Sequence, residues 1–275
     1  MKKRKNGYKN IILFLFMILC FGVFIFSLTK IMEWKIDSNQ VKKQITEIEK
    51  VIDITEVNDT NKTEIIEQEE EIPQSNPYWD YIEMNLINVD FKDLKKTNSE
   101  TVGWIQVNGT NINYPFVQTK DNEYYLTHSF NKTDNNAGWV FLDYRNHISN
   151  LDQNTIIYAH GRLDNVMFGT LKNILTNGWL NNSNNYVLKL STENENTLWQ
   201  VFSVYRIPTT NDYLQINFNN ENEFKSFADK LKDRSDYNFN TNVSGSDHIL
   251  TLSTCYNTSD KVVLHAKLIK KETKN

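Results

Sequence analysis

One cysteine, Cys255, combines a reactive side chain with a position that suits a reaction. It ends an alternating apolar run, residues 248–255, and a second strand-like run, residues 262–269, follows after a short turn. Strands hold their side chains rigidly, so a thiol at a strand end is firmly positioned at the surface. A lone cysteine can equally pack as a small, buried apolar residue. The position of Cys255 alone does not distinguish this structural role from a catalytic one.

The N-terminal region indicates the compartment of Cys255. Residues 11–28 are uncharged and almost wholly apolar, and as a helix rising ~1.5 Å per residue they nearly cross a bilayer core. Basic residues at positions 2–5 and Lys9 precede them, which predicts a cytoplasmic N-terminus and a remainder outside the cytosol. No small-residue cleavage site follows, so the segment predicts an uncleaved anchor rather than a signal peptide.

This location leaves Cys255 without a disulfide partner, because the other cysteine, Cys20, lies within the apolar segment. A lone cysteine outside the cytosol is either incidental or kept for its chemistry. The compartment therefore favours a nucleophilic thiol.

A thiol nucleophile needs a neighbouring base or cation, because a free thiol with a pKa of about 8.5 is mostly protonated at neutral pH. A histidine can favour the thiolate and later protonate a leaving amine. The chain has five histidines: His128, His147, His160, His248 and His265. His160 ends a buried-looking strand, residues 155–160, and barrels present working groups at strand ends. The alternation around His265 predicts a structural role.

Acyl transfer through a thiol also needs a donor to the developing oxyanion. Backbone N–H groups near Cys255 can donate to this oxyanion. Lys261, which begins the last strand after a short turn, is a second candidate donor. The alternative interpretation is that Lys261 is a solvated lysine at a strand end. No His, Cys, Asp and Glu cluster has metal-site spacing and there is no glycine-rich phosphate loop, so we expect no metal and no cofactor. The net charge of −4 argues against a nucleic-acid partner.

The remaining pattern predicts a mainly β domain. Polar and acidic residues over 32–76 predict a solvated stalk, with a short amphipathic helix near residues 41–52. Helices are predicted at residues 78–86, 90–96, 167–175 and 224–231, and strands at residues 102–107, 112–117, 138–144, 155–160, 186–190, 198–207, 248–255 and 262–269. About eight closely spaced strands with few helices favour a closed or nearly closed β-barrel.

These residues resemble the sortase family, class B, over roughly residues 78–270. The resemblance is carried by Thr251-Leu252-Ser253-Thr254-Cys255, by residues 156–161 and 167–173, and by shorter segments at 102–105, 113–115, 124–128, 141–146 and 263–268. It implies an eight-stranded β-barrel with N-terminal helices and a helix in the long connection before the cysteine strand, behind a single transmembrane helix. The chain then divides into a basic cytoplasmic tail (1–10), a transmembrane signal anchor (11–31), a polar acidic stalk (32–76) and a catalytic domain (77–275).

The resemblance also implies a membrane-anchored cysteine transpeptidase on the extracellular face of a Gram-positive bacterium. Such enzymes cleave a C-terminal sorting signal of the Asn-Pro-x-Thr type after threonine, hold the acyl group as a thioester, and pass it to an amine of the cell wall. Cys255 would be the nucleophile, His160 the general acid/base, and Thr254 and Ser253 would shape the substrate site. The expected partners are sorting-signal peptides of surface proteins, a peptidoglycan amine and the membrane.

One position departs from the family pattern. Sortases place an arginine at the start of the last strand, where this chain has Lys261. Lysine keeps the charge but loses the planar guanidinium fork. An arginine from elsewhere in space could replace it, and Arg206 is the first candidate. Two other functions stay open: a catalytically weak or inactive sortase-like binding or scaffold protein, and a membrane-anchored thiol hydrolase.

Overall fold

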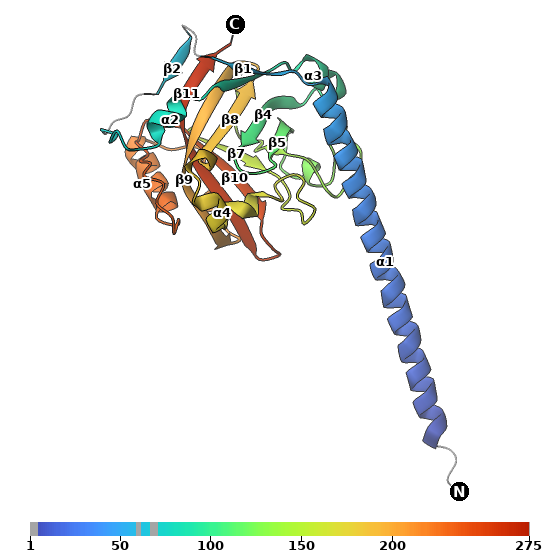
Figure 1. Ribbon diagram of the computed structural model, residues 1–275. Coiled ribbons are helices and arrows are strands. Elements are labelled where there is room, and N and C mark those ends of the chain that lie inside the picture. Colours follow the sequence, from blue (N-terminus) through green and yellow to red (C-terminus); the bar gives the residue numbers. More distant parts are fainter. Residues whose placement is uncertain (1–4, 59–61, 67–70, 275) are drawn as a thin grey trace.

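Eight strands form a closed barrel at the centre of the structure (Figure 1). This computed structural model describes residues 5–58, 62–66 and 71–274. The barrel strands are β4 (Thr101–Val107), β5 (Asn113–Val117), β6 (Phe141–Leu142), β7 (Asn154–Tyr158), β8 (Val187–Thr192), β9 (Glu195–Pro208), β10 (Ile249–Cys255) and β11 (Asp260–Thr273). Around the barrel they follow the order β10-β7-β6-β5-β4-β8-β9-β11, and the pairing of β11 with β10 closes the ring. The described residues confirm the predicted eight-stranded barrel.

The alternation of apolar residues along the strands builds two separate cores. Trp104, Phe116 and Leu264 belong to the buried cluster that fills the barrel. Val263 belongs to a second cluster between the outer face of the barrel and α5 (Glu221–Lys232). Neighbours in one strand thus serve different cores, because successive side chains of a strand point to opposite faces.

Helix α5 confirms the helix predicted over residues 224–231 and extends it at both ends. The side chain of Asn220 caps its N-terminus by accepting a hydrogen bond from the Glu223 N–H at 3.0 Å. Phe224, Phe227 and Leu231 recur at helical spacing and are buried. The connection between β9 and β10 therefore carries its own apolar face and covers the strand that ends at the cysteine.

Three predicted elements are shorter than the pattern suggested. The helix over 78–86 stops at Ile82 because residues 86–89 form a strand paired with residues 54–57. The strand over 138–144 shrinks to β6 because the chain turns at Asp143. The helix over 167–175 is a 3₁₀ helix from Leu171, since Met167 has a φ of 53°. The short elements are α2 (Tyr78–Ile82), β3 (Leu86–Val89), α3 (Lys92–Thr97), η1 (Tyr124–Leu126), η2 (Leu171–Leu175), α4 (Asn177–Leu180) and η3 (Ser183–Asn185).

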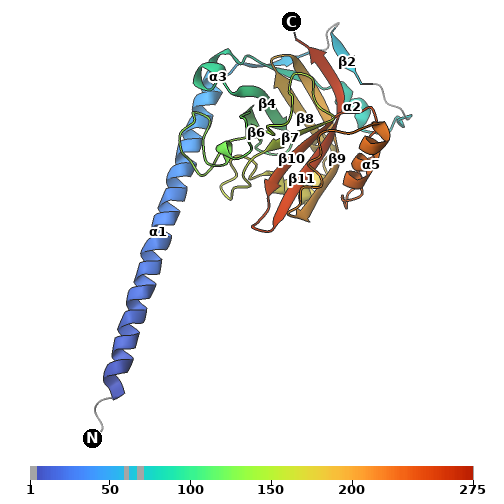
Figure 2. The ribbon, with the colours of Figure 1, turned by 180° about the vertical axis from the view of Figure 1, so that it is seen from behind.

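The N-terminal helix α1 (Lys5–Val51) runs without a break from the apolar segment onto the domain (Figures 1 and 2). Within the described ranges it is the one helix long and apolar enough to cross a membrane. Residues 8–36 are exposed, whereas Val41 and Ile48 are buried against the barrel. The amphipathic helix predicted near residues 41–52 is therefore the end of α1, apart from Ile52, which follows it.

The solvated stalk predicted over residues 32–76 is wrong where the structure describes that segment. β1 (Ile54–Val57) pairs with β3, and β2 (Thr63–Ile65) pairs with the end of β11. Glu56 and Glu64 remain exposed on these strands, so their charges stay hydrated while the backbone groups are paired. Residues 59–61 and 67–70 of the acidic run, and residues 1–4 of the basic tail, lie outside the described residues.

A chain of buried hydrogen bonds crosses the outer face of the barrel. Thr251 Oγ1 donates to Asn154 Oδ1 at 2.7 Å, so its oxygen accepts from His265 Nδ1 at 2.9 Å. The other ring nitrogen, Nε2, then accepts from the Tyr205 hydroxyl at 2.8 Å. Complete burial, together with the charge of Arg234, lowers the pKa of His265 to about 3. The imidazole is neutral in the folded chain, which confirms its predicted structural role.

We expect His265 to make stability fall as the pH drops below its unfolded pKa. The unfolded imidazole takes up a proton near pH 6.5, whereas the folded one stays neutral down to about pH 3. The unfolded state therefore binds more protons in this interval, and one such group changes stability by ~1.4 kcal/mol per pH unit. Urea unfolding of residues 32–275 at pH 6.5 and 5 should show a loss of about 2 kcal/mol from this group. His265→Gln should lack that component, and an unchanged pH dependence in this variant would contradict the assignment.

Candidate active site

Cys255 is the last residue of β10 and is exposed. It lies directly opposite Lys261 of β11, and opposite residues of an antiparallel pair share one face of the sheet. The Lys261 ammonium donates a hydrogen bond to the thiol, with Nζ 3.0 Å from Sγ. The turn between the two strands thus places a positive charge against the cysteine.

His160 follows the end of β7, the parallel neighbour of β10. Tyr158 of β7 lies opposite Ser253 of β10, and beyond that pair Thr254 Oγ1 donates to the Ala159 carbonyl at 2.8 Å. A Cβ on Gly161 would lie 2.0 Å from the Cys255 carbonyl oxygen. The backbone on both sides of His160 therefore runs directly alongside residues 254–255, and the pairing places the backbone of the predicted histidine next to that of the predicted cysteine.

Two neighbouring backbone segments fix the His160 ring. Its Nε2 lies 2.8 Å from the Leu126 carbonyl oxygen at the end of η1, so this nitrogen donates its proton there. A Cβ on Gly138 would lie 3.0 Å from His160 Cδ2 and 2.4 Å from the Tyr125 carbonyl oxygen, and Gly138 has a φ of 62°. Only glycine fits this position readily. With Nε2 engaged, Nδ1 is the free nitrogen of the neutral ring.

The hydroxyls of Ser253 and Thr254 do not face solvent. Ser253 is buried and its Oγ lies 2.9 Å from the Tyr213 hydroxyl oxygen. Thr254 is buried too, with its hydroxyl bound to β7 as described above. Both hydroxyls are therefore engaged within the protein, and what these two residues do in the structure is to fix the end of the strand through packing and hydrogen bonds.

Arg206 of β9 lies at the same end of the barrel but serves another contact. It is opposite Val262, whereas Ile207 is opposite Lys261, so its side chain leaves the sheet on the face away from the thiol. Its guanidinium pairs with Asp260 and stacks on Tyr256, 4.0 Å from the ring centroid. The hydrogen bond from Arg206 lowers the pKa of Asp260. Arg206 thus braces the β10–β11 turn, and Lys261 provides the described cationic contact to the thiol.

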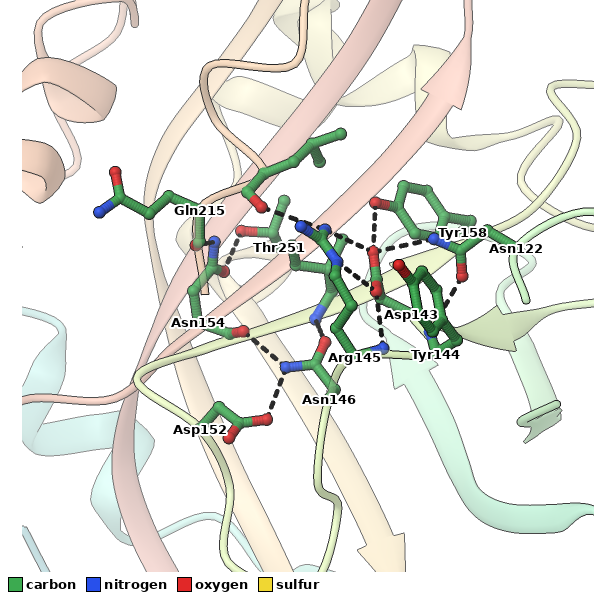
Figure 3. Close-up of polar contacts among 12 residues, drawn as sticks. Asn122, Asp143, Tyr144, Arg145, Asn146, Asp152, Asn154, Tyr158, Gln215 and Thr251 are labelled. Atoms are coloured by element: carbon green, nitrogen blue, oxygen red, sulfur yellow. Dashed lines mark hydrogen bonds and ion pairs between the residues drawn. The ribbon is translucent and has the colours of Figure 1, made fainter. Parts of the chain in front are cut away.

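Sequence reasoning missed a buried carboxylate behind these strand ends (Figure 3). The side chain of Asp143 is fully buried and accepts hydrogen bonds from Arg145 Nε and Nη2, the Tyr158 hydroxyl and Asn122 Nδ2 at 2.8–3.0 Å. Burial alone would raise the pKa of Asp143, but the hydrogen bonds and charge of Arg145 and the Tyr158 hydroxyl lower it below its ordinary value. The ion stays charged and joins β6 to the strand that carries His160.

The same network reaches the segment that covers Ser253. Arg145 Nη2 donates to the Leu214 carbonyl oxygen at 3.1 Å, beside Tyr213. Asn154 Nδ2 donates to the Gln215 carbonyl oxygen at 2.8 Å (Figure 3). The sequence signal that could have pointed to Asp143 is the segment over residues 141–146. This segment carries part of the family resemblance, but the resemblance assigns no role to its residues. In the described part of the chain, no group of three or more His, Cys, Asp or Glu side chains could hold a metal ion.

Comparison with known proteins identifies the family. A model of the sortase domain matches residues 105–269. Sortase B of Staphylococcus aureus is 35% identical over 188 residues, covering 67% of this chain and 76% of the relative. Sortase B of Listeria monocytogenes is 37% identical over 186 residues, covering 66% and 75%.

Solved structures agree in sequence and in shape. A Staphylococcus aureus sortase B–substrate complex has a TM-score of 0.61 at 36% identity, covering 66% of this chain and 84% of that one. Bacillus anthracis sortase B in complex with AAEK1 has a TM-score of 0.61 at 40% identity, with the same coverage of 66% and 84%. The barrel, its cysteine strand and these relatives together show that this chain belongs to the sortase family, class B, which consists of cysteine transpeptidases.

Proposed function

We propose that this transpeptidase cleaves a C-terminal sorting signal of the Asn-Pro-x-Thr type after threonine and joins the protein to a cell-wall amine. The observation that supports it most directly is the Lys261 ammonium 3.0 Å from the Cys255 sulfur, at the end of the strand that pairs with the strand before His160. A cation beside an exposed thiol stabilises the thiolate, which is the nucleophilic form, and a histidine at the end of the neighbouring strand can exchange a proton with the reacting groups.

In the first half-reaction the Cys255 thiolate attacks the threonine carbonyl carbon. The carbon–nitrogen bond breaks, the His160 imidazolium protonates the leaving amine, and a thioester to Cys255 remains. In the second half an acceptor amine attacks the thioester carbonyl. His160 takes up the amine proton, and the thiolate leaves as the new amide forms. One proton thus passes through His160 in each direction.

Lys261 takes the part of the family arginine in this proposal. Its ammonium is a point charge rather than a fork, so it can attract the thiolate and the developing oxyanion but cannot bind both oxygens of a planar group. Donors of this kind contribute ~2.7–4 kcal/mol to a barrier. The contact of Lys261 with the thiol, and the engagement of Arg206 elsewhere, favour Lys261 over Arg206 as the working cation.

The proposal includes a location. Residues 1–10 would lie in the cytoplasm and residues 11–31 in the membrane, with the catalytic domain from about residue 77 on the extracellular face of a Gram-positive cell. The apolar, exposed N-terminal half of α1 and the preceding basic residues support this orientation. The peptides would then be signals of surface proteins, and the acceptor a peptidoglycan amine.

Replacement of the nucleophile should abolish turnover. The full-length chain in detergent is mixed with a quenched Asn-Pro-x-Thr peptide and an added amine, and intact mass follows the acyl adduct. We expect an adduct on Cys255 that the amine converts into a ligated product, and a loss of at least ~10⁴-fold in kcat/KM for Cys255→Ala.

Circular dichroism controls for the fold of Cys255→Ala. Unchanged turnover in the folded variant would contradict the role of Cys255. Cleavage without amine transfer would indicate a hydrolase instead, and binding of the peptide without an adduct would indicate an inactive relative.

Lys261→Met should lower kcat/KM by ~10²–10³-fold, because it removes the cation at the thiol and at the developing oxyanion. Lys261→Arg should retain most of the activity, since it keeps the charge at the same position. Arg206→Met is the matched control: it removes a cation at the same end of the barrel, and we expect a change of less than about tenfold, a smaller loss than that of one oxyanion donor. A larger loss for Arg206→Met than for Lys261→Met would reverse the assignment.

A further inference from the structure

Helix α1 passes from its apolar segment to the barrel without a linker. The apolar run ends at Leu28, Thr29 and Lys30 follow it, and Ile31 and Met32 are again apolar. Ser38 is already buried against the domain at 4% exposure. From Met32 to Ser38 a helix rises only ~9 Å. The side of the barrel that contacts this part of α1 therefore lies close to the C-terminal end of the apolar segment.

The loop after His160 makes the contact nearest to the apolar segment. The Arg162 guanidinium carbon lies 5.4 Å from the ring centroid of Trp34. Arg162 pairs with Asp164 at 2.8 Å, and the two side chains are 7% and 6% exposed. Asp164 also accepts a hydrogen bond from Ser38 of α1. A buried ion pair thus fastens the loop over residues 161–167 to the helix.

A second loop beside His160 is tied to the next part of the helix. Asn136 Nδ2 donates to Asp37 Oδ2 at 3.0 Å, and Asn135 Nδ2 donates to Gln40 Oε1 at 3.1 Å. These asparagines precede Gly138, which packs against the His160 ring. Two independent sets of contacts therefore fix the position of the His160 region along the axis of α1, called its height below.

This height corresponds to the headgroup layer of a bilayer. Trp34 lies ~3 Å along the helix beyond Met32, and the polar layer on each side of the hydrocarbon core is roughly 5–8 Å thick. Tryptophan prefers this layer in membrane-spanning helices. At the tip of the adjoining loop, Leu163 is 84% exposed, although burial of a leucine side chain is worth ~1.5–3 kcal/mol.

The catalytic end of the barrel faces the same way. In Figures 1 and 2 the turn between β10 and β11 lies at the lower end of the barrel, the end toward which the N-terminal half of α1 extends. The C-terminus lies at the opposite end. Cys255 precedes this turn and Lys261 follows it.

We infer that Trp34 and Leu163 rest in the headgroup layer of the membrane and hold the catalytic end of the barrel against the bilayer surface. The inference rests on the membrane anchoring in the proposed function and adds a second point of attachment, three residues from His160. Its occupant is the lipid interface, because the contact continues the membrane-spanning segment directly. A peptide would then be cleaved close to the point where it leaves the bilayer.

Depth-dependent fluorescence quenching tests this contact. The full-length chain with Cys20→Ser and Cys255→Ala is placed in nanodiscs of phosphatidylcholine and phosphatidylglycerol, and a nitrobenzoxadiazole dye is attached in turn to Leu163→Cys, Phe24→Cys and Asn194→Cys. Phe24 reports insertion of the apolar segment. Asn194, in the β8–β9 turn, is the exposed control, and its carbonyl accepts a backbone hydrogen bond from Lys274 near the C-terminus.

Lipids spin-labelled on the headgroup should quench the dye at residue 163 several-fold more than the dye at residue 194. Lipids spin-labelled on the acyl chain should quench the dye at residue 24. If residue 24 is quenched but residue 163 is not, the inference fails while the anchor stands. If residue 24 is not quenched, the anchor fails and the inference with it.

Equal quenching at residues 163 and 194 would also overturn the inference, because the contact would then have no defined face. The transpeptidation assay of the unsubstituted chain in the same nanodiscs reports on the proposed reaction separately. Its failure would leave the quenching result, and therefore this inference, intact.

Discussion

The parallel pairing of β7 with β10 is the interaction on which the catalytic arrangement depends. It joins strands about 95 residues apart, as the Thr254–Ala159 hydrogen bond illustrates, and it helps to close the barrel. The pairing register sets which residues meet where the strands end, so His160 emerges beside Cys255. A shift of one residue would turn the alternate side chains to the other face. Thr254 and the close approach of Gly161 to Cys255 hold that register at its last step.

Polar interactions behind the strand ends give this register its rigidity. The buried Asp143 carboxylate and the neutral His265 avoid the energetic cost of an unpaired buried charge in opposite ways. Asp143 remains charged because several donors, including Arg145, compensate for its burial, whereas His265 gives up its charge and joins a chain of neutral hydrogen bonds. Both ring nitrogens of His265 and both carboxylate oxygens of Asp143 have hydrogen-bond partners, which is the condition for a buried polar group to stabilise a fold. The exposed thiol therefore stands on a surface whose supporting side chains cannot easily move.

The N-terminal segment is part of the same structural unit. An acidic linker between membrane and enzyme would allow the catalytic domain to sample many heights and orientations. Here α1 carries its helical repeat onto the barrel and packs Val41 and Ile48 there, and the following strands add to the sheets. The helix that anchors the chain in the proposed function also contacts both loops around His160. In the proposed location, the position of the active site relative to the membrane is therefore a property of the fold.

The sequence by itself determined the elements with strong local signals. Period-two alternation predicted the barrel strands, and helical spacing of aromatic residues predicted α5. A strand-end cysteine in a region expected outside the cytosol led to the hypothesis of a nucleophile with His160 as its partner, which the proposed function retains. Tertiary structure decided what depends on pairing across the chain. Lys261 contacts the thiol while Arg206 faces away, Asp143 supports the strand before His160, and residues 54–57 and 63–65 of the acidic segment form strands. Local patterns record which face of an element is apolar, but they contain no information on which distant strand will share that face. Register and partner choice are fixed only when the whole barrel closes.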